Sequence, residues 1–322
     1  MNETLAAARA HNRRRGRAVR WFHNDPSQQE MQMVEALRRE EVRGVITPIV
    51  TPFNRDETID FECFEREVSF MEASGIRVII IGGSTGSGNE LNAEDLATLI
   101  RTATTKSNLR VIAGIIPDTT KDAIHRSLLA KEAGAAALLL CPPTYNGMTD
   151  ESALAFITDV AAASELPIVF YDHFNYSVDL LKTIARLPEV IAIKCVFQNI
   201  GELVQTVGDH VTIAAGYDPI TLAGYVMGAE ASICGVHAVL PKQNVDIYRA
   251  FKDGNIAEAM QLTKAIGPIC REVSQATNFP TRIKYAIGML GRDVGTPIRP
   301  LDRIGETDKA AIDDALRVAG LR

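Results

Sequence analysis

Short apolar runs alternate with longer segments of helical period along most of the chain, from Gly44 onward. Runs that are apolar without polar alternation are typical of strands in a parallel sheet that is covered on both faces. The predicted strands are residues 45–50, 78–81, 109–116, 135–140, 167–171, 190–193, 211–215 and 231–234. An alternation of this kind, repeated eight times, predicts an α/β fold with a parallel sheet.

The segments between these runs carry the start and stop signals of helices. Helices are predicted at residues 56–73, 92–105, 119–132, 149–163 and 177–187. Asn92, with Asp95 three residues later, resembles a capping box, and Gly75 and Gly134 stand where helices should end. Eight β/α units in roughly 250 residues fit a closed (β/α)8 TIM barrel better than an open doubly wound sheet.

The chain divides into three predicted parts: an N-terminal extension at residues 1–42, the barrel at 43–254 and a C-terminal helical region at 255–322, in which one helix opens near Pro280. The first 20 residues hold six arginines against the single acid Glu3. We expect a helical or frayed extension that packs on the barrel or on a neighbouring subunit. A targeting or anion-binding arm is the alternative.

Composition narrows the class of protein. With 322 residues, 46% hydrophobic and 23% charged, the chain is an ordinary globular protein, and its net charge of -6 argues against a nucleic-acid partner. No apolar run reaches the ~18 residues that cross a bilayer, and no signal peptide is evident. The cysteines are widely spaced without a metal-ligand pattern, which predicts reduced thiols and a cytoplasmic location: Cys63, Cys141, Cys195, Cys234 and Cys270.

Lys194 stands in "EVIAIKCVFQN" (189–199), at the end of the sixth predicted strand, with no acid beside it. A lysine at a strand end can carry its charge to solvent on its long stem. Alternatively, a desolvated amine has a lowered pKa and can attack a carbonyl to form a Schiff base. Active sites of barrels form at the carboxyl ends of the strands, and this position favours the second interpretation.

Segments with polar or reactive side chains also stand at the carboxyl ends of other predicted strands: "GGSTGSG" (82–88), "CPPTYN" (141–146), "YDHFNY" (171–176), "GYD" (216–218) and "GVHA" (235–238). Gly83 to Gly88 has the spacing of a phosphate loop, but Asn89-Glu90 follows where Lys-Ser or Lys-Thr should stand. The loop is predicted to hold a small anion such as a carboxylate, or to be a plain turn. No metal ion or cofactor is predicted.

These motifs resemble those of a known family. The resemblance covers about residues 43–305 and rests on "GVITPIVTPF" (44–53), "GGSTG" (82–86), "PPTYN" (142–146), "IVFYD" (168–172), "IAIK" (191–194), "GYD" (216–218) and "NFPTRIKYAIGMLG" (278–291). The family is that of the pyruvate-dependent class I aldolases and lyases, which includes dihydrodipicolinate synthase and N-acetylneuraminate lyase.

The resemblance implies a role for each matching residue. Lys194 matches the Schiff-base lysine, and Tyr171 matches the tyrosine that shuttles protons. Ser84 and Thr85 match the pair that binds the keto acid carboxylate, and Ser84 is also implied to be catalytic, as a link in the proton relay of Tyr171. Tyr145 matches a tyrosine that reaches across a dimer interface into the neighbouring site, so the resemblance also implies a homotetramer built as a dimer of dimers.

The remaining substrate-binding candidates come from the last two strand ends: Gly216, Asp218 and Val236. We expect Asp218 to accept a hydrogen bond from a substrate hydroxyl, or else to cap a helix that starts at Pro219. His173 and His237 could contact substrate or serve the structure.

Departures from the family pattern bear on the reaction. Residues 171–177 lack the arginine with which dihydrodipicolinate synthases bind a second carboxylate, Ser87 and Cys195 stand where acids are frequent, and Pro219 replaces an acid. The predicted function is that of a Schiff-base lyase that acts on pyruvate or a hydroxylated 2-keto acid. The predicted reaction is aldol cleavage, aldol condensation or dehydration. The alternatives are a dihydrodipicolinate synthase-type condensation, a 2-keto-3-deoxy acid dehydratase or deaminase, and an inactive member with a binding or regulatory role.

Overall fold

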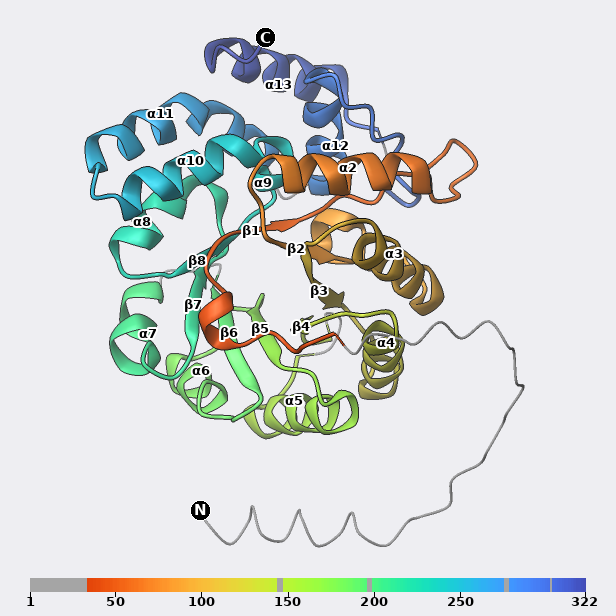
Figure 1. Cartoon of the computed structure of the whole chain (residues 1–322), viewed down its shortest axis with the longest axis vertical. Coiled ribbons are helices and arrows are strands. Elements are labelled where there is room, and N and C mark those ends of the chain that lie inside the picture. Colours follow the sequence, from red (N-terminus) through yellow and green to blue (C-terminus); the bar gives the residue numbers. More distant parts are fainter. Residues whose placement is uncertain (1–33, 144–146, 196–198, 275–277, 302) are drawn as a thin grey trace, which may run out of the picture. The chain divides into compact units, whose positions relative to one another are not determined.

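Eight parallel strands close into a barrel in the order in which they occur along the chain (Figure 1). The computed structural model describes residues 34–143, 147–195, 199–274, 278–301 and 303–322. The strands are β1 (Gly44–Pro48), β2 (Val78–Ile81), β3 (Arg110–Ile115), β4 (Ala137–Leu140), β5 (Ile168–Asp172), β6 (Val190–Cys195), β7 (Thr212–Ala215) and β8 (Ala231–Ile233). Each overlaps a predicted run, so the (β/α)8 barrel is confirmed.

Helices surround the barrel and continue beyond its last strand (Figure 1). Those that follow β1 to β7 are α2 (Phe61–Ala73), α3 (Ala93–Lys106), α4 (Thr120–Glu132), α5 (Asp150–Ser164), α6 (Val178–Ile184), α7 (Ile200–Val207) and α8 (Thr221–Val226). After β8 come α9 (Val236–Val239), α10 (Pro241–Lys252), α11 (Ile256–Val273), α12 (Phe279–Met289) and α13 (Glu306–Val318). Short 3-10 turns are η2 (Arg39–Glu41), η3 (Ser84–Gly86) and η4 (Asp218–Ile220).

The helix boundaries follow local capping chemistry. The side chain of Asn92 accepts a hydrogen bond from the backbone N–H of Asp95 at 2.7 Å, and thereby satisfies a donor in the first turn of α3. Gly75 and Gly134 follow α2 and α4 with φ of 88° and 98°, a left-handed conformation that glycine adopts without steric cost.

The predicted start of the first helix at residue 56 is wrong. The chain makes a tight turn there, in which the N–H of Asn54 donates to the C=O of Thr58 at 2.8 Å. The helix begins only at Phe61, because the carboxylate of Asp60 accepts a hydrogen bond from the N–H of Cys63 at 2.9 Å.

The strands sort their side chains between two cores. One cluster fills the inside of the barrel and includes residues from all eight strands, among them Ile46, Val169 and Ala192. A larger cluster lies between the strands and the surrounding helices and includes Phe170 and Ile193. Since successive side chains of a strand point to opposite faces, each strand serves both cores.

One irregularity sets the register between β5 and β6. Ile168 pairs with Val190, but Val169 pairs with Ala192, so Ile191 is an extra residue on β6. Because a shift of one residue exchanges the two faces of a strand, this bulge brings Lys194 opposite Tyr171.

Residues 34–42 pack against the amino ends of the strands. Leu37 is buried in the inner cluster, and its N–H donates to the C=O of Ala136 at 2.8 Å. The guanidinium of Arg110 pairs with the carboxylate of Glu41 at 2.9 Å. Residues 1–33 lie outside the described residues, and the predicted division at residue 42 stays a prediction.

A buried ion pair links α2 to the C-terminal region. Arg292 donates from Nη1 to Glu67 Oε2 at 2.7 Å and from Nη2 to the C=O groups of Ala238 and Val239 at 3.0 and 2.8 Å. Its guanidinium also lies 4.1 Å from the ring centroid of Phe70. Burial raises the pKa of Glu67, and Arg292 opposes that shift.

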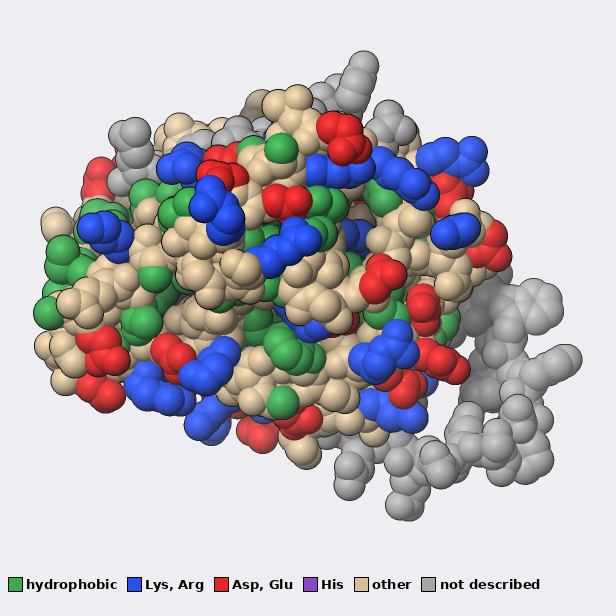
Figure 2. Space-filling model, turned by 90° about the horizontal axis from the view of Figure 1, so that it is seen from above, with side chains coloured by type: hydrophobic (Ala, Val, Ile, Leu, Met, Phe, Trp, Pro, Cys, Tyr) green, Lys and Arg blue, Asp and Glu red, His purple; other side chains and the backbone are tan. Residues whose placement is uncertain are grey.

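The face seen in Figure 2 carries Lys and Arg side chains interspersed with Asp and Glu side chains. Among the described residues, no helix combines the length and apolar character that crossing a bilayer requires.

We expect Arg292→Met to lower the free energy of unfolding by about 3–5 kcal/mol, because it leaves the Glu67 carboxylate buried without a partner. The double variant Glu67→Met/Arg292→Met should regain part of this loss, since no buried charge remains. Urea unfolding of the three proteins provides the measurement. A double variant less stable than Arg292→Met would contradict this account.

Candidate active site

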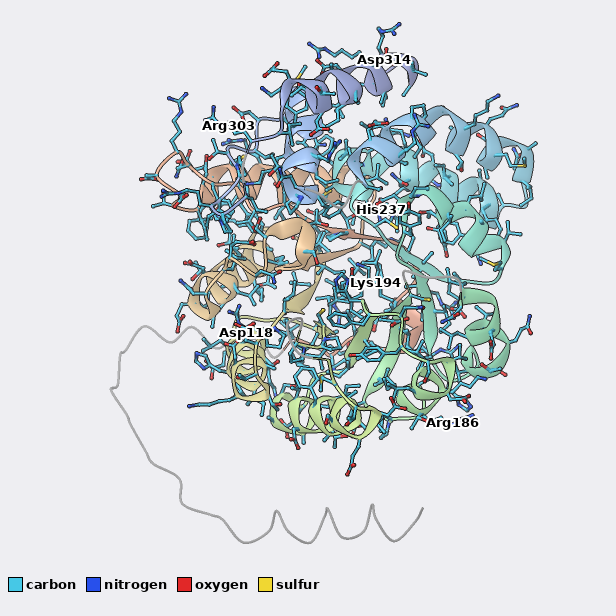
Figure 3. The ribbon with its side chains drawn as sticks, turned by 180° about the vertical axis from the view of Figure 1, so that it is seen from behind. Asp118, Arg186, Lys194, His237, Arg303 and Asp314 are labelled. Carbon is cyan, nitrogen blue, oxygen red and sulfur yellow. The ribbon has the colours of Figure 1, made fainter. Side chains whose placement is uncertain are left out.

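The carboxyl ends of β5 and β6 bring an amine and a phenol together inside the barrel. Lys194 Nζ lies 3.8 Å from the centroid of the Tyr171 ring, and the two residues are only 8% and 7% exposed. Figure 3 shows Lys194 inside the ring of strands. Among the residues that the structure describes, no acid forms an ion pair with this amine. The predicted pair of chemically active residues is thus in one place.

The neighbouring strand leaves room for the lysine side chain. Ala214 of β7 pairs with Lys194 and offers only a methyl group to the interior. Gly216 follows β7, and a Cβ atom there would lie 3.0 Å from Lys194 Cε and 3.1 Å from Lys194 Cγ. A side chain at this position would therefore press on the stem of Lys194.

Lys194 opens into a cavity of about 790 Å³ at the carboxyl ends of the strands. The predicted site residues that line it are Ser84, Thr85, Tyr171, Lys194, Gly216 and Asp218. Val236 is fully buried and does not belong to the lining. Tyr145, the predicted contribution to a neighbouring subunit's site, lies outside the described residues.

The glycine-rich loop after β2 forms a compact turn with two hydroxyls on the cavity side. Neither Ser84 nor Thr85 has a side-chain hydrogen-bond partner among the described residues, although Thr85 is only 3% exposed. The turn is tightly packed, since a Cβ atom at Gly88 would lie 1.8 Å from the C=O oxygen of Gly82. Thr51 holds the turn by donating to the C=O of Gly86 at 2.7 Å. Two free hydroxyls are suited to a small anion.

Asp218 lines the cavity, but its carboxylate already accepts two hydrogen bonds from the protein. The N–H of Val236 donates to Oδ1 at 2.7 Å, and the hydroxyl of Ser274 donates to Oδ2 at 2.9 Å. The Asp218 side chain therefore binds the start of α9. It does not cap the helical turn at Pro219, which was the alternative role predicted for it. Val236 thus acts on Asp218 through its backbone. Burial raises the pKa of Asp218, and these two hydrogen bonds oppose the rise.

Three further ionisable groups face the cavity, and burial shifts the pKa of each toward its neutral form. Burial and the charge of Lys194 lower the pKa of His173, whose ring lies 5.2 Å from that of Tyr171. Burial raises the pKa of Glu90, and it raises the pKa of Cys141 to about 12. The imidazole and the thiol are therefore neutral near pH 7.

His237 serves the structure, not the cavity. It is fully buried, with Nδ1 3.0 Å from the C=O oxygen of Ile46 and Nε2 3.2 Å from Ser232 Oγ. The Ser232 hydroxyl in turn lies 2.6 Å from the Tyr225 hydroxyl. A neutral ring that donates from Nδ1 and accepts at Nε2 satisfies this chain. Of the two candidate histidines, only His173 lines the cavity.

The sequence did not single out several residues that line the cavity: Glu90, Ser274, Phe279, Pro280 and Leu301. Glu90 lies seven residues after Gly83, directly beyond the glycine-rich loop, and this closeness to a predicted site loop could have identified it as a candidate. The other four belong to the C-terminal region, and their place at the site depends on how α11 and α12 pack on the barrel. Among the described residues, no group of three or more His, Cys, Asp or Glu side chains could hold a metal ion.

Comparison with known proteins shows the family to which the chain belongs. A family model described as the dihydrodipicolinate synthetase family matches residues 41–319. The chain belongs to this family. It is 31% identical over 283 residues to a 4-hydroxy-tetrahydrodipicolinate synthase of Methanothrix thermoacetophila, which covers 85% of this chain and 96% of the relative.

Two further members of the dihydrodipicolinate synthetase family agree with this assignment. A 4-hydroxy-tetrahydrodipicolinate synthase of Anaplasma marginale is 31% identical over 289 residues, or 87% of this chain and 96% of the relative. The crystal structure of a dihydrodipicolinate synthase from Agrobacterium tumefaciens superposes with a TM-score of 0.81 at 26% identity, over 87% of this chain and 99% of that one. The predicted family, fold and enzyme class, a Schiff-base-forming lyase, are confirmed.

His237 should make the stability of the protein depend on pH. Burial lowers its pKa to about 4, against 6.5 for an exposed imidazole. As the pH falls, His237 takes up a proton in the unfolded chain before it does so in the folded protein. Its contribution to the free energy of unfolding is therefore complete above pH 6.5 and is lost as the pH falls from 6.5 toward 4. The loss from this residue should be about 3 kcal/mol.

The measurement is the free energy of unfolding at pH 7 and near pH 4.5. In His237→Gln the difference between the two values should be smaller than in the unchanged protein. His125→Gln is the control, because the side chain of His125 is 56% exposed. An equal pH dependence in all three proteins would show that His237 titrates normally.

Proposed function

We propose that the chain is a Schiff-base lyase that acts on pyruvate or a hydroxylated 2-keto acid through Lys194. The observation that carries this proposal is the Lys194 amine, which faces the cavity, pairs with no acid in the part of the chain that the structure describes, and lies 3.8 Å from the Tyr171 ring centroid. An amine that is not held in an ion pair can lose its proton and attack a carbonyl carbon.

The reaction begins with addition of the Lys194 nitrogen to the keto carbon. The resulting carbinolamine loses water and becomes a protonated imine. The C=N bond then accepts an electron pair from a bond at the neighbouring carbon. Cleavage of the carbon-carbon bond there, with transfer of the proton of the hydroxyl on the departing carbon to a base, gives an enamine and an aldehyde. Loss of a proton from the neighbouring carbon, followed by loss of the hydroxyl as water, gives the dehydrated product instead. Condensation is the reverse of cleavage.

Tyr171 is proposed to carry the protons that these steps require. Its phenol stands next to the amine on the adjacent strand, where it can protonate the leaving oxygen of the carbinolamine and take the proton back later. Ser84 and Thr85 are proposed to bind the keto acid carboxylate through their free hydroxyls. Ser84, together with Tyr145 from a neighbouring subunit, is proposed to complete the proton path.

Asp218 and Gly216 are proposed to face the rest of the substrate. A carboxylate has about four acceptor positions, so Asp218 can accept a substrate hydroxyl in addition to Val236 N–H and the Ser274 hydroxyl. Val236 is then a positioning residue, because its N–H holds Asp218. Residues 171–177 provide no arginine for a second carboxylate, so a neutral, hydroxylated tail is proposed.

A second candidate is the condensation after which the relatives are named. The names of the Methanothrix and Anaplasma proteins, each 31% identical to this chain, favour it. Against it stands the loop after β5, where Asp172 accepts a hydrogen bond from the N–H of Tyr176 at 2.9 Å and no arginine faces the cavity. Formation of 4-hydroxy-tetrahydrodipicolinate by the purified protein would decide for this candidate.

A homotetramer and a cytoplasmic location are part of the proposal. The role proposed for Tyr145 requires at least a dimer, and the family resemblance favours a dimer of dimers. The location is supported by Cys63, Cys141, Cys234 and Cys270, which are buried free thiols.

Replacement of Lys194 tests the covalent step directly. Both Lys194→Ala and Lys194→Arg should lose turnover and trapping of pyruvate by borohydride, because arginine keeps the charge but is not a usable nucleophile. Mass spectrometry of the reduced protein locates the adduct. Lys284→Arg is the matched control, since Lys284 is also buried but does not line the cavity. An adduct that persists in either Lys194 variant would refute the Schiff-base mechanism.

Tyr171→Phe should still form the imine but turn over about 10²–10⁴-fold more slowly, the usual contribution of a positioned general acid or base. The aromatic ring remains beside Lys194, so the packing is kept. Borohydride trapping and steady-state rates, measured on the same preparation, separate the two steps. An unchanged rate would leave Tyr171 with a packing role alone.

A further inference from the structure

A second hollow lies beside the active cavity and is lined by arginines. Its volume is about 720 Å³. We refer to it as the arginine pocket, and its lining residues are Arg55, Glu57, Thr296, Pro297, Arg299, Leu301 and Arg303. Leu301 also lines the active cavity, so the two hollows are neighbours. Figure 3 shows Arg303 toward the outside of the molecule, away from Lys194 at its centre.

Two segments that are far apart in the sequence form the walls, and several contacts fix them to each other. The turn before α2 and the segment before α13 lie side by side, as Figure 1 shows. Phe53 forms isolated bridges with Ile59 and with Gly295. The hydroxyl of Thr296 donates to the C=O of Asn54 at 3.2 Å. Backbone bridges and a side-chain hydrogen bond therefore hold the two walls of the pocket together.

The charges of this pocket are not balanced. Glu57 pairs with Arg299 through two contacts of 2.5 and 3.0 Å, which satisfies one guanidinium. Arg55 and Arg303 form no ion pair with any described residue. Among the described residues that line the pocket there are thus three guanidinium groups and one carboxylate, in a protein whose net charge is -6. Guanidinium groups bind carboxylate and phosphate oxygens in a two-pronged manner, which suits a ligand with two negative charges.

We propose that the arginine pocket binds a small dianion, a phosphate or a dicarboxylate, at a site separate from the keto-acid cavity. Arg55 and Arg303, which form no ion pair with the residues that the structure describes, supply guanidinium groups, and the Glu57–Arg299 pair links the two walls. This binding does not depend on the proposed function of the cavity. The chemistry of the ligand is that of a compact dianion, because the described lining residues carry an excess of two positive charges.

The test is a calorimetric titration with inorganic phosphate, and then with succinate, at a constant ionic strength set by chloride. We expect one saturable site per chain, and a Kd that rises about tenfold or more in the double variant Arg55→Gln/Arg303→Gln. The matched control is Arg77→Gln/Arg186→Gln, which removes the same charge from two exposed arginines that do not line the pocket. Figure 3 shows Arg186 on the other side of the molecule from Arg303.

Absence of saturable binding to the unchanged protein would overturn the proposal, and so would an equal rise of Kd in the control double variant. A thermal unfolding curve for each variant shows whether the fold is kept. Phosphate should bind Lys194→Ala with the same Kd as the unchanged protein. A loss of binding there would show that the anion sits in the keto-acid cavity and would overturn the claim of a separate site.

A second readout rests on the proposed function. Positive charge beside the mouth of the cavity raises the local concentration of an anionic keto acid, and a bound dianion cancels that charge. Phosphate should therefore raise KM for the keto acid without changing kcat, and this effect should vanish in Arg55→Gln/Arg303→Gln. If phosphate lowered kcat instead, the dianion would be acting inside the cavity. Loss of turnover in all proteins, with phosphate binding intact, would count against the proposed function only.

Discussion

The register between β5 and β6 is the constraint on which this site depends. Tyr171 and Lys194 face the interior together because Ile191 is an extra residue in β6. In a continuous register, Tyr171 would pair with Ile193, and Lys194 would pair with the outward-facing Asp172. The amine would then lie against the surrounding helices, far from any substrate. The single bulge residue Ile191 thus decides whether the Lys194 amine of β6 faces the cavity.

The appended helices belong to the site as much as the barrel does. Ser274, which follows α11, donates to the Asp218 carboxylate, and Phe279 and Pro280 of α12 line the cavity. Arg292 binds α2 and the end of α9 through one guanidinium group. The C-terminal region therefore forms part of the cavity wall, and its packing contributes to the shape of the cavity.

A comparison of two lysines shows that burial alone does not make an amine reactive. Lys284 is 4% exposed, and burial lowers its pKa to about 7, yet it donates to the C=O of Thr296 at 2.7 Å and does not line the cavity. Lys194 is similarly buried, but its amine faces an open cavity and lies over an aromatic ring. Access to a carbonyl carbon, and not desolvation by itself, separates the structural lysine from the chemical one.

The sequence by itself determined the barrel, the order of its strands and the placement of Lys194, Tyr171, Ser84 and Thr85 at strand ends. These features follow from local apolar patterns and from motifs, because a strand's side-chain period and a helix's cap are encoded by neighbouring residues. The start of α2 was misjudged, since the turn before Asp60 competes with the helical pattern. Only the tertiary structure decided which residues from distant segments meet. Burial of His237, the contact between Asp218 and α9, and the shared wall at Leu301 all arise from packing between segments, which no local pattern records.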